Sequence, residues 1–433
     1  MKLQGKMSTD EQGQLSIGGC KAADLVKEYG TPLYVMDEEH IREKCRGFKN
    51  SFRHEYLSTE VIYASKAFLN KAMCKLIEEE GLSLDVVSGG ELYTAMAVGF
   101  PMERIYFHGN NKTKDELMMA LKAGVGRIIV DNRYEIGRIE RLCIELNKEI
   151  RVLLRVNPGI EAHTHEYIQT AMHDSKFGES IYDEALCDII GLCQESKHIR
   201  LMGFHCHIGS QIFEERSFYN AAEVMIDFLA RVERDCKFIT EELNLGGGFG
   251  VYYVDGDDPV EIESCLHNLL NTINDAYQKA GISIPKIMIE PGRAIVANAG
   301  CTLYTIGGIK DTYGGKRYVF VDGGMTDNPR TALYDAKYEA AIANRLLEPA
   351  TTQVTVAGKC CESGDIIIRD INLPVAEPGD ILCVTNTGAY NYTMSSNYNR
   401  IPRPAVIFVK NGQTKVVVKR ETYDDLIRND LDS

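Results

Sequence analysis

Between VIYASKA (61–67) and KIMIEPGR (286–293) the sequence repeats one pattern, in which a short apolar segment ends in polar residues or glycine. The repeats are VIYASKA (61–67), LSLDVVS (82–88), RIYFHGN (104–110), RIIVDN (127–132), RVLLRVN (151–157), LMGFHCHIG (201–209), ELNLGGG (242–248) and KIMIEPGR (286–293). Short segments rich in Val and Ile are typical of buried β-strands. We therefore expect one strand in each of these eight segments.

The segments between the expected strands have helical spacing. Examples are NKAMCKLIEEEG (70–81), ELYTAMAVG (91–99) and KDELMMALKAG (114–124), the last of which ends at a glycine suited to a helix C-cap. Alternating strands and helices predict parallel βα units, and this number of units predicts a (β/α)8 TIM-like barrel. A doubly wound open sheet is the alternative. The long polar connection from Asn157 to Leu201 is of the kind that is often functional in barrels.

The pattern changes beyond the eighth segment. Short apolar segments separated by turn residues follow, among them RYVFVDGG (317–324), TQVTVAG (352–358), DIIIRDI (365–371), GDILCVTNTGAY (379–390) and AVIFVKNG (405–412). Asn411–Gly412 lies between two apolar segments and predicts a hairpin. This part is expected to be an all-β domain, to which PLYVMD (32–37) adds a strand. We thus expect a barrel over 37–297 and a β domain built from 1–36 and 298–433.

The composition limits the classes of protein to which this chain can belong. The chain has 433 residues, of which 44% are hydrophobic and 25% charged, enough for two globular domains. A net charge of −14 argues against nucleic-acid binding, because phosphate repels an acidic chain. The 13 scattered Cys do not indicate a disulfide framework. We see no signal peptide and no apolar run near the roughly 18 residues of a membrane helix. A cytoplasmic protein of a reducing compartment, without a membrane partner, is expected.

Polar residues gather where the expected strands end, which is where a barrel forms its active site. Lys66 follows the first segment. Inside a barrel mouth its ammonium would be desolvated and its pKa lowered, which favours Schiff-base chemistry, whereas a surface lysine is the alternative. Glu290 closes the eighth segment. A buried carboxylate needs a partner, either a protonated ring nitrogen or a neighbouring Lys or Arg.

The glycine run LGGGFG (245–250) and Arg293 together predict a phosphate site. Glycines let backbone N–H groups approach a phosphate, and arginine offers a bidentate fork. The loops after strands seven and eight of TIM barrels commonly bind phosphate. The run alone could equally be a turn, and it does not meet the dinucleotide-binding pattern.

His205 and His207 lie two residues apart, so a strand projects both to one face. Such a pair is typical of metal sites, but no third ligand with sensible spacing follows nearby. An imidazole that stacks on an aromatic cofactor is the alternative, and the adjacent Ser210 adds a hydroxyl. We therefore expect no metal.

Several motifs occur together in a characteristic order. They are YASKAF around Lys66, HCHIGSQ around His207, LGGGFG and EPGR. With them the chain resembles the fold-type III pyridoxal-phosphate decarboxylases, which include ornithine, arginine and diaminopimelate decarboxylases. Segments from about Leu15 to about Pro404 are similar to the diaminopimelate decarboxylases in particular: GTPLYVMD, DVVSGGE, RVNPGIEAHTHEYI, DSKFG, RTALYDA, CESGD and GAYNYTMSSNYN. The resemblance implies pyridoxal 5'-phosphate and the decarboxylation of meso-2,6-diaminopimelate to L-lysine and CO2, the last step of lysine biosynthesis.

The resemblance also implies which residues bind the cofactor. Lys66 attaches it as a Schiff base, His207 stacks on its ring, and Glu290 bonds to the pyridine nitrogen. The phosphate side is lined by Ser210, Gly246, Gly247, Gly248, Pro291, Gly292, Arg293 and Tyr390. A carboxylate at the ring nitrogen favours a decarboxylase, because it keeps the ring protonated and strongly electron-accepting. An arginine there would resemble the racemases of the same fold.

Substrate contacts are implied in the same way. Arg330 and Tyr334 hold the far carboxylate, Glu362 receives the far ammonium group, and Arg293 and Tyr390 also reach the substrate. Ornithine and arginine lack a far carboxylate, so a pocket with Arg330 would repel them. A non-catalytic binding homologue and a barrel enzyme acting on phosphorylated sugars are two competing hypotheses. The intact catalytic motifs argue against the first, and the β domain with its CESGD motif argues against the second.

Cys361 is the implied proton donor, and with Glu362 it comes from the partner subunit of a homodimer with shared active sites. Cys360 stands directly beside it. Adjacent residues on an extended strand face opposite ways, so only one should reach the cofactor. We expect Cys360 to be a structural thiol.

Overall fold

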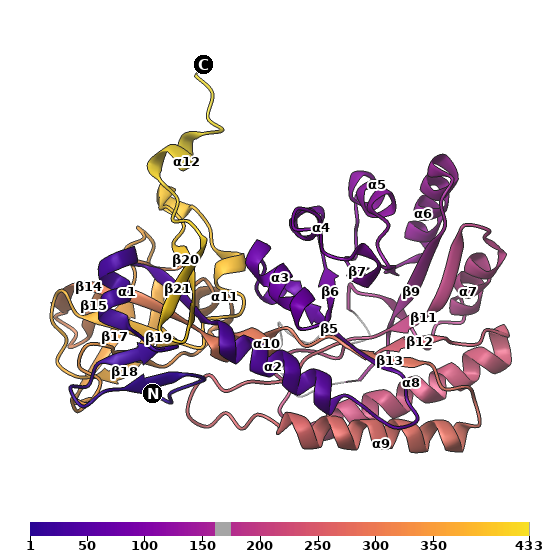
Figure 1. Ribbon diagram of the computed structural model, residues 1–433, viewed down its shortest axis with the longest axis horizontal. Helices are drawn as coiled ribbons and strands as arrows, with labels where there is room; N and C mark the ends of the chain where they lie inside the picture. Colours follow the sequence, from indigo (N-terminus) through magenta and orange to yellow (C-terminus); the bar gives the residue numbers. More distant parts are fainter. Residues whose placement is uncertain (161–174, 433) are drawn as a thin grey trace. The chain divides into compact units, whose positions relative to one another are not determined.

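The computed structural model describes residues 1–160 and 175–432. The chain separates into two compact units (Figure 1). We call residues 45–250 and 259–292 the barrel unit, and residues 1–44, 251–258 and 293–433 the sheet unit. The short segment 251–258 packs with the sheet unit although the barrel unit flanks it on both sides in sequence.

The barrel unit contains a closed parallel barrel, because β8 pairs with both β7 and β9. The described strands follow the order β9, β11, β12, β13, β5, β6, β7, β8 around the ring. Their bounds are β5 (Thr59–Ala64), β6 (Ser83–Val86), β7 (Ile105–Phe107), β8 (Arg127–Val130), β9 (Ile150–Asn157), β11 (Ile199–His205), β12 (Glu242–Asn244) and β13 (Lys286–Ile289). Each predicted segment overlaps one of them, so the expected barrel is confirmed, and a short strand, β10 (Glu179–Ser180), pairs beside the end of β9.

Apolar side chains from six barrel strands meet in one cluster. The cluster consists of Ile62, Tyr106, Ile129, Leu153, Met202 and Met288. All six are nearly inaccessible to water. This is the environment expected for apolar side chains that point into the interior of a barrel.

Helices connect the strands and surround them in Figure 1. They are α2 (Glu38–Ser51), α3 (Lys71–Glu79), α4 (Gly89–Met96), α5 (Lys114–Ala123), α6 (Arg133–Leu146), α7 (Leu186–Glu195), α8 (Glu215–Cys236) and α9 (Ile262–Ala280). Local sequence sets the ends of α5, since Thr113 and Glu116 form a capping box and Gly124 takes a left-handed conformation (φ 78°). The three predicted helical segments correspond to α3, α4 and α5.

One disulfide is present that the spacing of the cysteines did not indicate. Cys187 and Cys236 form a disulfide that joins α7 to α8, whereas the other 11 cysteines form no disulfide within the described residues. The two partners are 49 residues apart and only the fold brings them together, which is why sequence spacing did not indicate the bond.

The sheet unit is built on a sheet in the order β18, β17, β15, β14, β4, β20, β21, and β19 pairs with both β14 and β16. The strands are β4 (Leu33–Asp37), β14 (Gly300–Asp311), β15 (Arg317–Val321), β16 (Ala340–Ile342), β17 (Thr352–Ala357), β18 (Ile366–Leu373), β19 (Ile381–Thr385), β20 (Ala405–Lys410) and β21 (Gln413–Val418). A small sheet holds β1 (Met7–Thr9), β2 (Leu15–Ile17) and β3 (Cys20–Lys21). As predicted, β4 joins the large sheet, and Asn411 and Gly412, both with positive φ (51° and 75°), turn between β20 and β21.

The sheet unit is not purely β. It also contains α1 (Ala22–Tyr29), α10 (Arg293–Val296), α11 (Arg330–Tyr334) and α12 (Tyr423–Ile427). Its 12-residue strand β14 was not predicted, because Gly300, Gly307 and Gly308 interrupt the apolar pattern. No helix among the described residues is long and apolar enough to cross a membrane.

Candidate active site

Polar side chains stand at the carboxyl ends of the barrel strands. His108 directly follows β7, His205 ends β11, Asn244 ends β12, and Glu290 directly follows β13. Because parallel strands end on the same side of a barrel, these residues from distant parts of the chain lie at one mouth. All four are buried.

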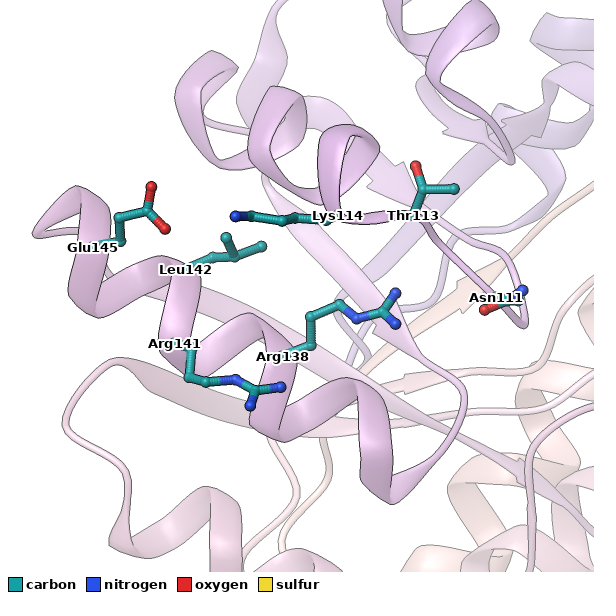
Figure 2. Close-up of a pocket in the computed structure, with 7 residues that line it drawn as sticks. All are labelled: Asn111, Thr113, Lys114, Arg138, Arg141, Leu142 and Glu145. Carbon is teal, nitrogen blue, oxygen red and sulfur yellow. The ribbon is translucent and has the colours of Figure 1, made fainter.

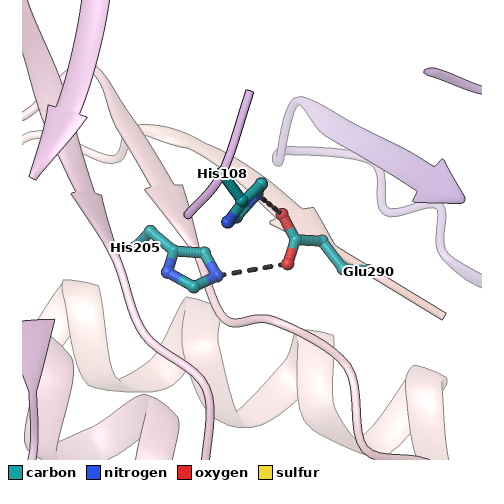
Figure 3. A group of neighbouring side chains, drawn as sticks. All are labelled: His108, His205 and Glu290. Carbon is teal, nitrogen blue, oxygen red and sulfur yellow. Dashed lines mark hydrogen bonds and ion pairs between the residues drawn. The ribbon is translucent and has the colours of Figure 1, made fainter. Parts of the chain in front are cut away.

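Glu290 is the centre of this group (Figure 3). Its Oε1 lies 2.8 Å from Nε2 of His108 and accepts a hydrogen bond from Nδ2 of Asn244 at 2.7 Å. Its Oε2 lies 3.1 Å from Nε2 of His205. The two imidazole rings pack edge to face, with centroids 4.8 Å apart. The carboxylate is therefore fixed from three strands at once.

Electrostatics keep this carboxylate ionised. Burial by itself raises the pKa of Glu290, but His108 and His205 outweigh it and hold that pKa well below its usual range. Burial lowers the pKa of His205 to about 4, so this imidazole is neutral at pH 7 and donates from Nε2. Nearby Asp85 behaves in the opposite way, since burial raises its pKa to about 6.

The glycine run lies beside Glu290. The Glu290 N–H donates to the Gly246 carbonyl at 2.8 Å, and the Gly247 N–H donates to Nδ1 of His207 at 3.3 Å. Gly246 has a φ of 71°, and a Cβ on it would lie 2.5 Å from the Cys206 carbonyl oxygen. Packing alone therefore requires a residue without a side chain at position 246.

The remaining predicted residues of the barrel unit surround this mouth. Lys66 lies in the 3-10 turn η1 (Ser65–Ala67) immediately after β5. It is exposed, which differs from the desolvated position that we expected, although Ser65 and Ala67 on either side of it are buried. Ser210 and His207 are half-buried, and the pKa of His207 is held well below its usual value by burial and by Lys66. Pro291 and Gly292 are buried beside Ala64.

A second cluster of predicted residues lies in the sheet unit. Arg293 begins α10 and donates from Nη1 to the hydroxyl of Tyr253 at 2.7 Å, with its guanidinium 4.8 Å from the ring centre of Tyr390. Arg330 begins α11, donates to the hydroxyl of Tyr338 at 2.9 Å and lies over the ring of Tyr253. Both arginines are buried. Among the described residues no carboxylate pairs with Arg330.

Cys361 and Glu362 are exposed, and Tyr334 at the end of α11 is half-buried. Cys360 and Cys361 do not lie on an extended strand as expected but in the bend between β17 and β18, where Asn399 accepts the N–H of Cys361 at 2.7 Å. The bend still separates the two thiols. Cys360 is buried, and burial raises the pKa of its thiol to about 11, so it remains protonated at neutral pH.

His108, His205 and Glu290 offer ligand atoms within 4.8 Å of one another, a spacing that could also hold a metal ion. His207, the other half of the predicted pair, is not in this group. The Nε2 atom of each imidazole already bonds to the carboxylate, whereas the buried Nδ1 of His205 has no hydrogen-bond partner among the described residues.

A pocket of about 610 Å³ lies elsewhere on the barrel unit, beside α5 and α6 (Figure 2). It is lined by Asn111, Thr113, Lys114, Arg138, Arg141, Leu142 and Glu145. None of the predicted site residues is among them, so this pocket is separate from the strand ends that carry the chemistry.

Sequence reasoning missed several members of both clusters. It noted His108 only as a strand end and did not single out Asn244, Tyr253 or Tyr338. The sequence did contain a signal for Asn244. On a strand, Asn244 lies on the same face as the polar Glu242, and the apolar Leu243 between them lies on the opposite face. Residues 161–168 of the motif RVNPGIEAHTHEYI and Asp174 of DSKFG lie outside the described residues.

Comparisons with known proteins agree on one family. The family model described as pyridoxal-dependent decarboxylase, pyridoxal binding domain, matches residues 38–297. A diaminopimelate decarboxylase of Bacillus subtilis is 52% identical over 100% of this chain and 98% of its own length. The crystal structure of diaminopimelate decarboxylase from M. jannaschii with L-lysine superposes with a TM-score of 0.93 at 32% identity, covering 100% of this chain and 99% of that one. The Helicobacter pylori enzyme with L-lysine gives a TM-score of 0.85 at 29% identity, covering 94% and 98%. The chain therefore belongs to the pyridoxal-dependent decarboxylase family, within the group of the diaminopimelate decarboxylases.

Proposed function

We propose that the protein decarboxylates meso-2,6-diaminopimelate to L-lysine and CO2 with pyridoxal 5'-phosphate, the last step of lysine biosynthesis. The similarity over the whole chain to relatives of that activity carries this proposal. Two similar structures were solved with L-lysine, which is the product of the proposed reaction.

The residues at the barrel mouth fit the cofactor. Glu290 offers a buried, ionised carboxylate to a ring nitrogen, and the close-packed glycines place no side chain between the backbone and a phosphate. Lys66 would attach the cofactor covalently and His207 would lie against its ring. Ser210, Gly246, Gly247, Gly248, Pro291, Gly292, Arg293 and Tyr390 would line its phosphate side. When bound, the cofactor supplies the electron sink for the bond that loses CO2.

The charge of Glu290 would determine how strongly the bound cofactor accepts electrons. The Glu290 carboxylate stays ionised at neutral pH, so it would keep the ring nitrogen of a bound cofactor protonated. Lys66 would hold the cofactor covalently, and its amine is the group that would exchange with the amine of the substrate.

The surroundings of Arg330 support the assignment of a substrate that has a second carboxylate. Its guanidinium is buried in the sheet unit, and in the part of the chain that the structure describes it has tyrosine neighbours only. A buried cation without an anion is unfavourable, and a substrate carboxylate would supply the missing partner. Tyr334 would assist, and Glu362 would take the far ammonium group.

Cys361 would return the proton to the carbon that has lost CO2. We place Cys361 and Glu362 in the active site of the partner subunit, so that the protein acts as a homodimer in the cytoplasm. Exposure of both residues on one chain is compatible with a role in a neighbouring subunit.

The test is CO2 release by the purified protein with added pyridoxal 5'-phosphate from meso-diaminopimelate, L-ornithine and L-arginine in parallel. We expect turnover of meso-diaminopimelate alone at a substantial rate. Preferred turnover of ornithine or arginine would contradict the substrate assignment, and no turnover of any of the three would contradict the decarboxylase itself.

A further inference from the structure

The two oxygens of Glu290 are not equivalent. Oε1 receives two donors, one from His108 and one from Asn244, whereas Oε2 lies near a single donor, His205. A carboxylate oxygen has two acceptor positions in its plane. Within the described residues Oε1 is therefore saturated, and Oε2 retains one position for a further N–H.

The donors to Oε1 are rigidly placed. His108 is 5% and Asn244 0% exposed. Asn244 ends β12, which pairs with β13, and His108 follows β7, which is reached around the ring on the other side of β13. The His108 ring also packs edge to face against His205. Side chains locked in this way by packing fix the rotation of the carboxylate that they hold.

The same donors affect the charge of Glu290. Asp85, Arg155, Cys206 and His207 also interact electrostatically with members of this cluster, and Asp85 favours protonation of its neighbours. A buried carboxylate that loses a donor loses part of what keeps it ionised. A neutral Glu290 could no longer hold a proton on the nitrogen that it faces.

We propose that His108 and Asn244 are positioning residues, which saturate Oε1 and so present the ionised Oε2 of Glu290 to the cofactor's ring nitrogen. This inference rests on the proposed function for the pairing of Glu290 with that nitrogen. His108 and Asn244 need not touch the cofactor or the substrate, because they act through Glu290.

Four variants test the proposal. His108→Leu removes the donor, His108→Gln keeps a donor of similar reach without the ring, and Asn244→Leu removes the second donor. His198→Leu is the matched control, since His198 precedes β11 and so stands at the opposite end of the strand from His205, where it bonds to the Lys148 carbonyl. Each protein is loaded with pyridoxal 5'-phosphate labelled with ¹⁵N in the ring, and the ¹⁵N chemical shift, the cofactor Kd and kcat with meso-diaminopimelate are measured.

We expect the ring nitrogen of the wild type, the control and His108→Gln to give the protonated shift. His108→Leu and Asn244→Leu should move it toward the unprotonated shift and lower kcat by about 10- to 100-fold, the effect of losing a hydrogen bond to a charged group. Asn244→Leu keeps the test decisive if His108→Leu does not fold. A purely structural role would lower thermal stability without moving the ¹⁵N signal.

The outcomes separate the two proposals. If the wild type decarboxylates meso-diaminopimelate while both leucine variants keep the protonated shift and the parent kcat, the positioning role is wrong and the proposed function stands. If the wild type binds no cofactor and releases no CO2, the proposed function fails and this inference with it.

Discussion

Arg330 is 8% exposed and has no carboxylate partner among the described residues, which makes its replacement the sharpest test of substrate choice. We consider Arg330→Met, which keeps much of the side-chain volume and removes the charge. The variant should fold, because Tyr338 retains a hydrogen-bond neighbour in Asn391 at 3.4 Å.

The size of the effect follows from burial. A substrate carboxylate would meet a guanidinium that is largely shielded from water, and removing one partner of such a pair costs about 2–5 kcal/mol. With 1.4 kcal/mol per factor of ten, kcat/KM for meso-diaminopimelate should fall by roughly 30- to 4,000-fold. Arg330→Lys keeps the charge but not the planar fork, so its loss should be smaller.

Two ligands make the assay specific. L-lysine retains the far carboxylate of the substrate, whereas cadaverine has none. Inhibition constants for both should therefore be measured on the wild type and on Arg330→Met, with circular dichroism and the cofactor absorbance as controls. We expect the inhibition constant of L-lysine to rise by the same factor by which kcat/KM falls. The inhibition constant of cadaverine should stay within about threefold of its wild-type value.

Two results would refute this reasoning. One is a kcat/KM for meso-diaminopimelate within threefold, roughly, of the parent value in a folded, cofactor-loaded variant. The other is an equal loss of affinity for L-lysine and cadaverine, which would indicate general damage to the site and not a lost carboxylate contact.

Three further outcomes are expected. Lys66→Ala should lose the covalent attachment of the cofactor and nearly all turnover, and a reducible imine at another lysine with full activity would show the assignment to be wrong. Mixing inactive Lys66→Ala with inactive Cys361→Ala should restore about a quarter of the activity if subunits share sites and exchange at random, and no recovery after proven exchange would exclude sharing. Burial raises the pKa of Asp85 to about 6, so its proton stabilises the fold fully below about pH 4 and this stability is lost as the pH rises through 6. The free energy of unfolding of Asp85→Asn, relative to that of the wild type, should therefore rise by roughly 2 kcal/mol between pH 4 and pH 7, as measured by urea unfolding at both pH values. The same difference between variant and wild type at both pH values would contradict a raised pKa of Asp85.

The barrel could be predicted because each strand carries its own signal. Short Val- and Ile-rich segments ending in polar residues mark the strands, and the Asn411–Gly412 pair marks a turn that needs two positive φ angles. Strand β14 carries a weaker signal, because Gly307 and Gly308 stand in its middle, and its identity depends on pairing with strands far away in sequence.

The site was only partly predictable for a related reason. A strand end can be read locally, but which side chains meet across the barrel depends on strand order and stagger. His108 and Glu290 are 182 residues apart, and nothing in either segment indicates that the other is its partner. The bend that carries Cys361 was taken for a strand because its neighbours on both sides are strands. Lys66 is exposed between the buried Ser65 and Ala67, a difference that the residue types alone do not indicate.

The hydrogen bond from the Glu290 N–H to the Gly246 carbonyl has a consequence for engineering and for natural variation. It joins the backbone of the proposed ring-nitrogen partner, just beyond β13, to the start of the proposed phosphate loop, just beyond β12, so the two proposed ends of the cofactor site would be held by one backbone hydrogen bond. A substitution that shifts the glycine run would also shift the carboxylate. If both roles hold, cofactor affinity and the protonation of its ring would change together, and variants that weaken one while preserving the other should be rare near this bond.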